Sequence, residues 1–210
     1  MLGLYGKHPA KGDFLETGLP VQPALEAWLD GALAEARNGL CDAWETVWAT
    51  ARPLRFWLGP SLWGGPVAGV LATSADKVGR RFPLLIIGMG ADCPPAPVID
   101  AAQGWHDAVA AHLTGLLAAE DIAANTALAG LAPPTPTALP AGPPEFWAVR
   151  PGADVSGLWE DVAVTDHHRA SHNRSYWWQT GGSHAQVWAG EGLPSGHVLA
   201  WFLRGYAENG

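Results

Sequence analysis

Apolar positions in the first part of the chain follow a helical period. Four of them recur at spacings of three and four residues and therefore share one helix face: Leu25, Trp28, Leu29 and Leu33. Gly39 is expected to end this helix. The segment DAWETVWATA predicts a second helix, in which Asp42 is the N-cap and Glu45 completes a capping box.

From Pro53 the apolar period shortens to two, which predicts a strand. Leu54, Phe56 and Leu58 lie on one side of this strand, and Arg55 and Trp57 lie on the other. The segments PVAGVLATS and FPLLIIGMG predict two further strands. The unbroken apolar run of the second favours a central strand that is covered on both faces.

The remaining segments complete the expected order of elements. LGLYGK predicts an opening strand, and an Ala-rich stretch from about Ile99 to Glu120 predicts a long helix. Strands dominate the last part, with EFWAVRP, DVAVTD, RSYWWQTG and HAQVWAG before a helix around SGHVLAWFLRGY. This order predicts an α/β or α+β layered domain, in which helices cover a central sheet. We expect one domain over residues 1–210, with a Pro-rich connector at about 132–144.

Composition excludes several classes of protein. The chain has 210 residues, of which 48% are hydrophobic and 15% charged, a balance typical of a compact globule. A net charge of -8 argues against nucleic-acid binding. The longest apolar run is too short to cross a bilayer, so we expect no direct membrane insertion. The start MLGLYGKHPAKGDF has no secretion signal, which favours a cytoplasmic location.

Two cysteines, Cys41 and Cys93, have no CxxC spacing. We expect both to be free, buried thiols.

A cluster of charge in SADKVGRRFPLLIIGMG stands directly before the expected central strand. Asp76 and Arg80 are four residues apart and close enough to pair across a turn. The first interpretation is a structural clamp that holds the loop between two strands. An anion or peptide-carboxylate site and a catalytic pocket remain alternatives.

A second polar group lies in YGKHPAKGDF. Gly6 and Gly12 permit special backbone angles, and Lys7, His8 and Asp13 could face the same sheet edge as the Asp76 loop. The segment lacks the GxxxxGK[ST] order of a phosphate-binding loop, so no nucleotide cofactor is expected.

Other candidate chemistry is weak. The segment TDHHRASH places His168 and His172 four residues apart beside Asp166 and His167, but it has no HExxH glutamate, so we expect an exposed polar loop and no metal. No GxSxG elbow is present, and neither cysteine lies in a nucleophile signature.

Twelve tryptophans are the strongest compositional oddity. Exposed indoles could bind a partner or stack on sugars, although core packing explains most of them. Trp177 and Trp178 are neighbours in an expected strand and so point to opposite faces. One of them must meet another layer, another subunit or solvent.

Three blocks of residues resemble the TagF family, also called ImpM, of accessory proteins in bacterial type VI secretion. These blocks are GLYGKHPAKGDF, SADKVGRRFPL, and SYWW followed by GLP and a terminal helix. The matching positions of the first block are Gly6, Lys7, Gly12, Asp13 and Phe14. The second block opens at Ser74, and its matching positions are Asp76, Val78, Gly79, Arg80, Phe82 and Pro83.

The resemblance implies a cytoplasmic, non-enzymatic regulator without a cofactor. Such a regulator represses the secretion apparatus after translation, by binding the forkhead-associated scaffold protein Fha. It also implies an α/β layered sandwich, in which helices flank a mixed β-sheet. The alternative to a regulator is a hydrolase that uses Lys7, Asp13, Asp76 and Arg80 around one cleft. A third possibility is a protein that binds cell-wall sugars, which would need a row of exposed indoles.

Overall fold

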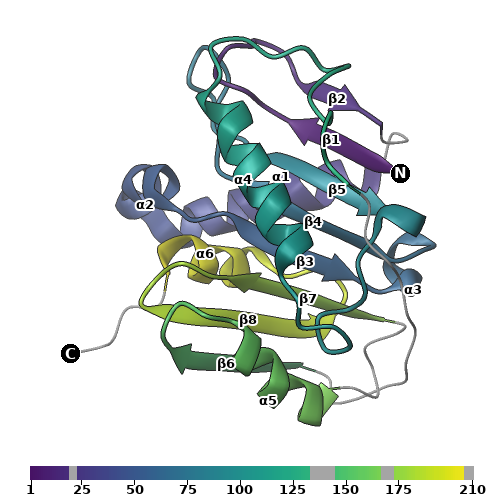
Figure 1. The fold of residues 1–210 in the computed structure, drawn as a ribbon. Helices are drawn as coiled ribbons and strands as arrows, with labels where there is room; N and C mark the ends of the chain where they lie inside the picture. The colour runs from purple at the N-terminus through teal and green to yellow at the C-terminus, as the bar shows by residue number, and fades with distance from the viewer. Residues whose placement is uncertain (19–22, 133–144, 167–172, 206–210) are drawn as a thin grey trace.

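A single sheet of eight strands organises the molecule, in the order β2-β1-β5-β4-β3-β7-β8-β6 (Figure 1). The computed structural model describes residues 1–18, 23–132, 145–166 and 173–205. In sheet order the strands are β2 (Leu15–Thr17), β1 (Leu2–Gly6), β5 (Leu84–Met89), β4 (Val67–Ala72), β3 (Leu54–Leu58), β7 (Arg174–Gln179), β8 (His184–Glu191) and β6 (Glu145–Pro151). Every neighbouring pair of strands is antiparallel.

Helices cover both faces of this sheet. The helices are α1 (Pro23–Leu40), α2 (Trp44–Thr50), α3 (Pro60–Trp63), α4 (Gly104–Ala118), α5 (Ser156–Asp166) and α6 (Gly196–Arg204), with short 3-10 turns η1 (Cys41–Ala43) and η2 (Gly90–Asp92). Helices α1, α2 and α6 lie on one face, and α4 and α5 lie on the other (Figure 1). The predicted α/β sandwich is confirmed, and its sheet pairs are antiparallel where a mixed sheet was expected.

The helical stripe read from the sequence forms the core on the α1 face. Leu29 is 0% exposed, and it packs in one cluster with Phe56 of β3 and Ile87 of β5. The opposite face of β5 packs on α4 through Ile86 and Val109. Strand β5 is therefore covered on both faces, as its unbroken apolar run predicts.

Trp177 and Trp178 show how neighbouring residues in a strand serve two layers. Trp177 packs in the cluster under α1, and Trp178 packs in the cluster under α5. Both side chains are buried, so each indole faces a helical layer of the same chain. Of the twelve tryptophans, Trp147 at 44% is the exposed one, and a row of exposed indoles is not present.

Two local expectations are wrong. DVAVTD, which we grouped with strands, lies in α5, because Trp159 and Val162 pack onto the sheet from a helix. Helix α2 begins at Trp44, after a 3-10 turn, and its N-cap makes no side-chain hydrogen bond. Asp42 and Glu45 therefore do not form a capping box.

The Pro-rich connector expected at about 132–144 lies outside the described residues, except for residue 132.

Candidate functional site

The Asp76 carboxylate lies at the centre of the two polar blocks. Its side chain is 0% exposed, and Oδ2 accepts hydrogen bonds from Lys7 Nζ at 2.9 Å and Arg80 Nε at 2.5 Å. Oδ1 accepts from the backbone N–H groups of Val78 at 3.0 Å and Arg80 at 2.9 Å. Both oxygens are thus engaged by two cations and two amides, which neutralises the buried charge.

The protonation of Asp76 follows from these contacts. Burial alone raises the pKa of a carboxyl group, because it disfavours the charged form. Hydrogen bonds from Lys7, the Arg80 backbone and side chain, and the Val78 backbone oppose burial and hold the pKa of Asp76 well below its usual range. Asp76 is therefore a carboxylate at neutral pH, in a salt bridge with Lys7 and Arg80.

The backbone brings these distant residues together at the end of β1. Gly6 has φ of 131°, and a Cβ atom there would lie 2.0 Å from the Pro83 carbonyl oxygen. Lys7 N–H donates to that oxygen at 3.1 Å, and Ser74 Oγ donates to the Lys7 carbonyl at 2.7 Å. The end of β1 is thus joined to both ends of the 73–83 loop between β4 and β5.

Phe14 places an exposed aromatic ring beside the ion pairs. The ring is stacked on Tyr5 at 5.4 Å between centroids and meets Phe82 edge-on at 4.9 Å. Lys7 Nζ lies 5.1 Å from the centroid of Phe14, so the ammonium sits between a carboxylate and an aromatic face. Phe14 nevertheless remains 46% exposed, and Val78 of the loop is 68% exposed.

Most of the site residues predicted from the first two blocks meet here. Lys7, Phe14, Ser74, Asp76 and Arg80 form one connected group, in which the Gly12 carbonyl accepts a hydrogen bond from Arg80 Nη2 at 2.9 Å. Gly79 allows the turn with φ of 84°.

Two parts of the prediction differ from this group. Asp13 is exposed and has no hydrogen bond or ion pair among the described residues, so it is not bonded to Asp76, Lys7 or Arg80. Trp177 and Trp178 belong to the core, and their indole N–H groups donate to Ser175 and Gln103 and not to this group.

A pocket that sequence reasoning missed opens next to the loop. Its volume is about 350 Å³, and it is lined by Leu33, Ala34, Arg37, Trp44, Glu45, Gly79, Arg80 and Arg81. Lys7, Asp13 and Asp76 do not line it. The doublet Arg80-Arg81 was visible in the sequence, but the approach of Arg37 from α1 depends on helix packing.

A second polar pocket of about 500 Å³ lies at the ends of other elements and includes Arg55, Gln103, Asp107, Asp154 and Thr180. Arg55 donates to Asp107 at 2.7 Å and Gln103 at 3.3 Å. The sequence signal for this pocket was Arg55, a charged residue among the apolar residues of β3.

His106 lies beside Arg55 and is 2% exposed. Burial first, and then the charge of Arg55, lower the pKa of His106 to about 3. The imidazole is therefore neutral in the folded protein at neutral pH.

The two cysteines and the histidines of TDHHRASH are the remaining residues with candidate chemistry. Cys93 is buried, which raises its pKa to about 12, while Cys41 is exposed, contrary to expectation, because it begins the turn η1 at the surface. Both thiols are free. His167, His168 and His172 lie outside the described residues, and within the described ranges no group of three or more metal-ligating side chains occurs.

Over the same described ranges, every helix is too short or too polar to span a membrane.

Comparison with known proteins agrees with this arrangement. The crystal structure of PA0076 from Pseudomonas aeruginosa PAO1 matches with a TM-score of 0.72 and 28% sequence identity, over 99% of this chain and 96% of that chain. No curated protein matches. The model of the TagF N-terminal domain, described as type VI secretion system-associated, matches residues 3–131, which include both polar blocks and the arginine-lined pocket. The chain therefore belongs to the TagF N-terminal domain family, which is associated with the type VI secretion system.

Proposed function

We propose that this chain is a non-enzymatic, cytoplasmic regulator that represses type VI secretion after translation by binding a protein of the apparatus, with the Fha scaffold as the partner. Association of the family with this secretion system supports the setting. The observation that carries the binding role is the Asp76 site. Its buried carboxylate is engaged by Lys7, Arg80 and two backbone amides, while the apolar side chains beside it face solvent.

The exposed face next to Asp76 is the proposed contact surface. Phe14 and Val78 come from the two family blocks and are 46% and 68% exposed. Exposed apolar side chains on a rigid frame are typical of a protein–protein contact. The ion pairs under them hold the loop in one shape, which lowers the entropy that binding would otherwise cost.

The hydrolase alternative has less support from the geometry. A general acid or base must reach a substrate, but Lys7 and Asp76 are buried and bonded to one another. Asp13 is exposed and makes no hydrogen bond or ion pair among the described residues. The four groups of that hypothesis therefore do not converge on one open cleft.

The direct test is binding of the purified protein to the Fha protein of the same bacterium. We expect binding with a Kd at or below the micromolar range, and increased secretion when the gene is deleted. Replacing Val78 by Asp puts a charge on the contact surface and should weaken binding by roughly tenfold or more.

A matched control is Val149→Asp, since Val149 is also exposed at 39% but lies on β6, remote from the loop in the sheet order. No binding at micromolar concentration, together with unchanged secretion after deletion, would refute the proposal.

A further inference from the structure

The pocket beside the 73–83 loop carries an excess of positive charge in an acidic protein. Arg37, Arg80 and Arg81 line it together with one carboxylate, that of Glu45. The whole chain has a formal net charge of -8. A local concentration of guanidinium groups against that background is a recognition feature for oxyanions.

All three guanidinium groups have N–H donors to spare. Arg81 is the one paired with a carboxylate of the pocket lining, because its Nε and Nη2 both donate to Glu45 Oε2, at 3.0 and 2.7 Å. Arg80 uses Nε on Asp76 and Nη2 on the Gly12 carbonyl, which leaves Nη1 without a partner among the described residues. Arg37 is exposed and has no hydrogen bond or ion pair within the described ranges.

The frame of the pocket holds these donors in position. Asp76 and Gly12 fix the Arg80 side chain at two points, so its remaining donor is oriented before any ligand arrives. The salt bridge between Arg81 and Glu45 connects the loop to α2 and so holds a second wall of the pocket. A preorganised cation beside a second, unpaired one suits a carboxylate that is held from two sides.

The rest of the lining shows what kind of molecule carries that carboxylate. Leu33 and Trp44 are largely buried and provide an apolar floor, and Ala34 leaves room at the rim. A volume of about 350 Å³ is larger than a lone anion needs and fits a short stretch of peptide. The pocket also shares the 73–83 loop with Val78 of the proposed contact surface.

We infer that this pocket binds an acidic side chain of the partner protein, a glutamate or aspartate with an apolar neighbour, between the guanidinium groups of Arg37 and Arg80. The inference rests on the proposed function and extends it, because it assigns the chemistry of the partner segment. Apolar contact at Phe14 and Val78 and charge recognition in the pocket then form one continuous surface.

The test uses a short fluorescein-labelled peptide of alternating glutamate and leucine, titrated with the full chain and followed by fluorescence anisotropy. We expect saturable binding that weakens as salt is added. A peptide with glutamine in place of glutamate should bind roughly tenfold more weakly or worse. Equal affinity for the two peptides would overturn the inference.

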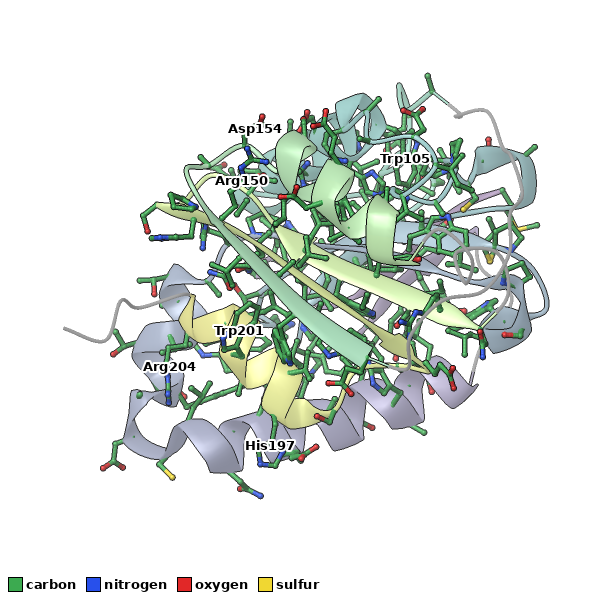
Figure 2. All side chains as sticks on the ribbon, turned by 90° about the horizontal axis from the view of Figure 1, so that it is seen from below. Trp105, Arg150, Asp154, His197, Trp201 and Arg204 are labelled. Atoms are coloured by element: carbon green, nitrogen blue, oxygen red, sulfur yellow. The ribbon has the colours of Figure 1, made fainter. Side chains whose placement is uncertain are left out.

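Variants assign the binding to the pocket. Arg37→Gln should weaken binding by roughly tenfold, and Ala34→Glu, which adds a carboxylate at the rim, should abolish it. The matched control is Arg204→Gln, because Arg204 is an exposed arginine at the end of α6 (Figure 2). Loss of binding in the control, or unchanged binding in both pocket variants, would also overturn the inference.

Two further arms separate possible outcomes. A phosphoserine version of the peptide that binds while the glutamate version does not would contradict a carboxylate site. Acidic-peptide binding that requires Arg37, in a protein that does not bind Fha, would support the pocket while refuting Fha as partner. Fha binding that is unaffected by both pocket variants would leave the proposed function standing and refute the pocket.

Discussion

Single residues decide whether the two polar blocks can meet. Gly6 and Gly79 both have positive φ, 131° and 84°, but their surroundings differ. At Gly6 an added Cβ atom would lie 2.0 Å from the Pro83 carbonyl oxygen, whereas nothing lies within 4 Å at Gly79. Position 6 therefore requires glycine both because of its positive φ and because a side chain would collide with Pro83. Position 79 requires glycine only because of its positive φ.

This difference gives a paired prediction. Gly79→Ala should lower the free energy of unfolding by about 1–2 kcal/mol, the cost of a positive φ for alanine. Gly6→Ala should cost more, about 3 kcal/mol or above, because the strand end must also move away from Pro83. Urea unfolding of both variants measures the values. Equal losses would show that the contact at Gly6 relaxes freely.

The two thiols differ in reactivity for the same kind of local reason. Cys41 is exposed, while Cys93 is buried with its pKa raised to about 12 by burial, so it is not a thiolate at ordinary pH. Iodoacetamide at pH 8 should label one thiol of the folded protein. Peptide mass spectrometry should find the label on Cys41, and Cys41→Ser should remove it. Rapid labelling of Cys93 without denaturant would contradict this assignment.

At the scale of elements, the 73–83 loop depends on a strand far away in the chain. Lys7 at the end of β1 is 69 residues from Asp76, and it supplies the buried cation that the loop carboxylate requires. Arg80 completes the pairing from within the loop. The loop is therefore shaped by β1 and by its own turn together.

Asp76→Asn tests this dependence. The amide keeps the size of the side chain but leaves the buried Lys7 ammonium without its counter-ion, so the melting temperature should fall by roughly 10 °C. Asp13→Asn, at an exposed carboxylate in the same block, should leave it nearly unchanged. Calorimetry provides the comparison. A stable Asp76→Asn protein would show that the ion pairs do not hold the loop.

At the scale of the whole molecule, acid should unfold the protein through two buried groups in succession. His106 has its pKa lowered to about 3 in the folded state, below about 6.5 in an unfolded chain. The unfolded state therefore binds the proton first, and stability is lost as pH falls from about 6.5 towards 3. Asp76 also has a lowered pKa, so its contribution is present above about 3.9 and is lost below that pH.

The pH profile can be checked by urea unfolding at several pH values. Between pH 6.5 and 4 we expect a loss of at most about 1.4 kcal/mol per pH unit from His106. His106→Phe keeps an aromatic ring beside Trp178, which lies 4.6 Å away between centroids, and should flatten this part of the profile. A variant as acid-sensitive as the parent would rule out His106 as the cause.

Sequence reasoning predicted most of the fold because single elements carry their own signals. The three- and four-residue spacing of apolar positions between Leu25 and Leu33 was sufficient for α1, and the apolar run of β5 was sufficient for a strand covered on both faces. It was wrong for α5, where the valines of DVAVTD favour a strand locally but Val162 packs on the sheet from a helix. Local propensity is weak compared with burial.

The candidate site was predicted only in part, because only some of its contacts join residues that are close in the sequence. Asp76 and Arg80 are four residues apart, so their pairing was accessible from the sequence. Asp13, which was grouped with them, is exposed and makes no hydrogen bond or ion pair among the described residues, because proximity along the chain does not decide what a side chain contacts. The pocket formed by Arg37, Glu45 and Arg81 combines two helices and a loop, and no local pattern indicates it.

By itself, the sequence determined the periodic faces of the elements, the i,i+4 ion pair and membership of a family linked to type VI secretion, since each depends on residues near one another or on their order along the chain. Tertiary structure alone decided that Lys7 neutralises Asp76, that Trp177 and Trp178 serve two layers, and that Arg37 approaches Arg80 across a pocket. These arrangements join residues distant in the chain, so they depend on how the helical layers and the strand ends pack on one sheet and not on any local pattern.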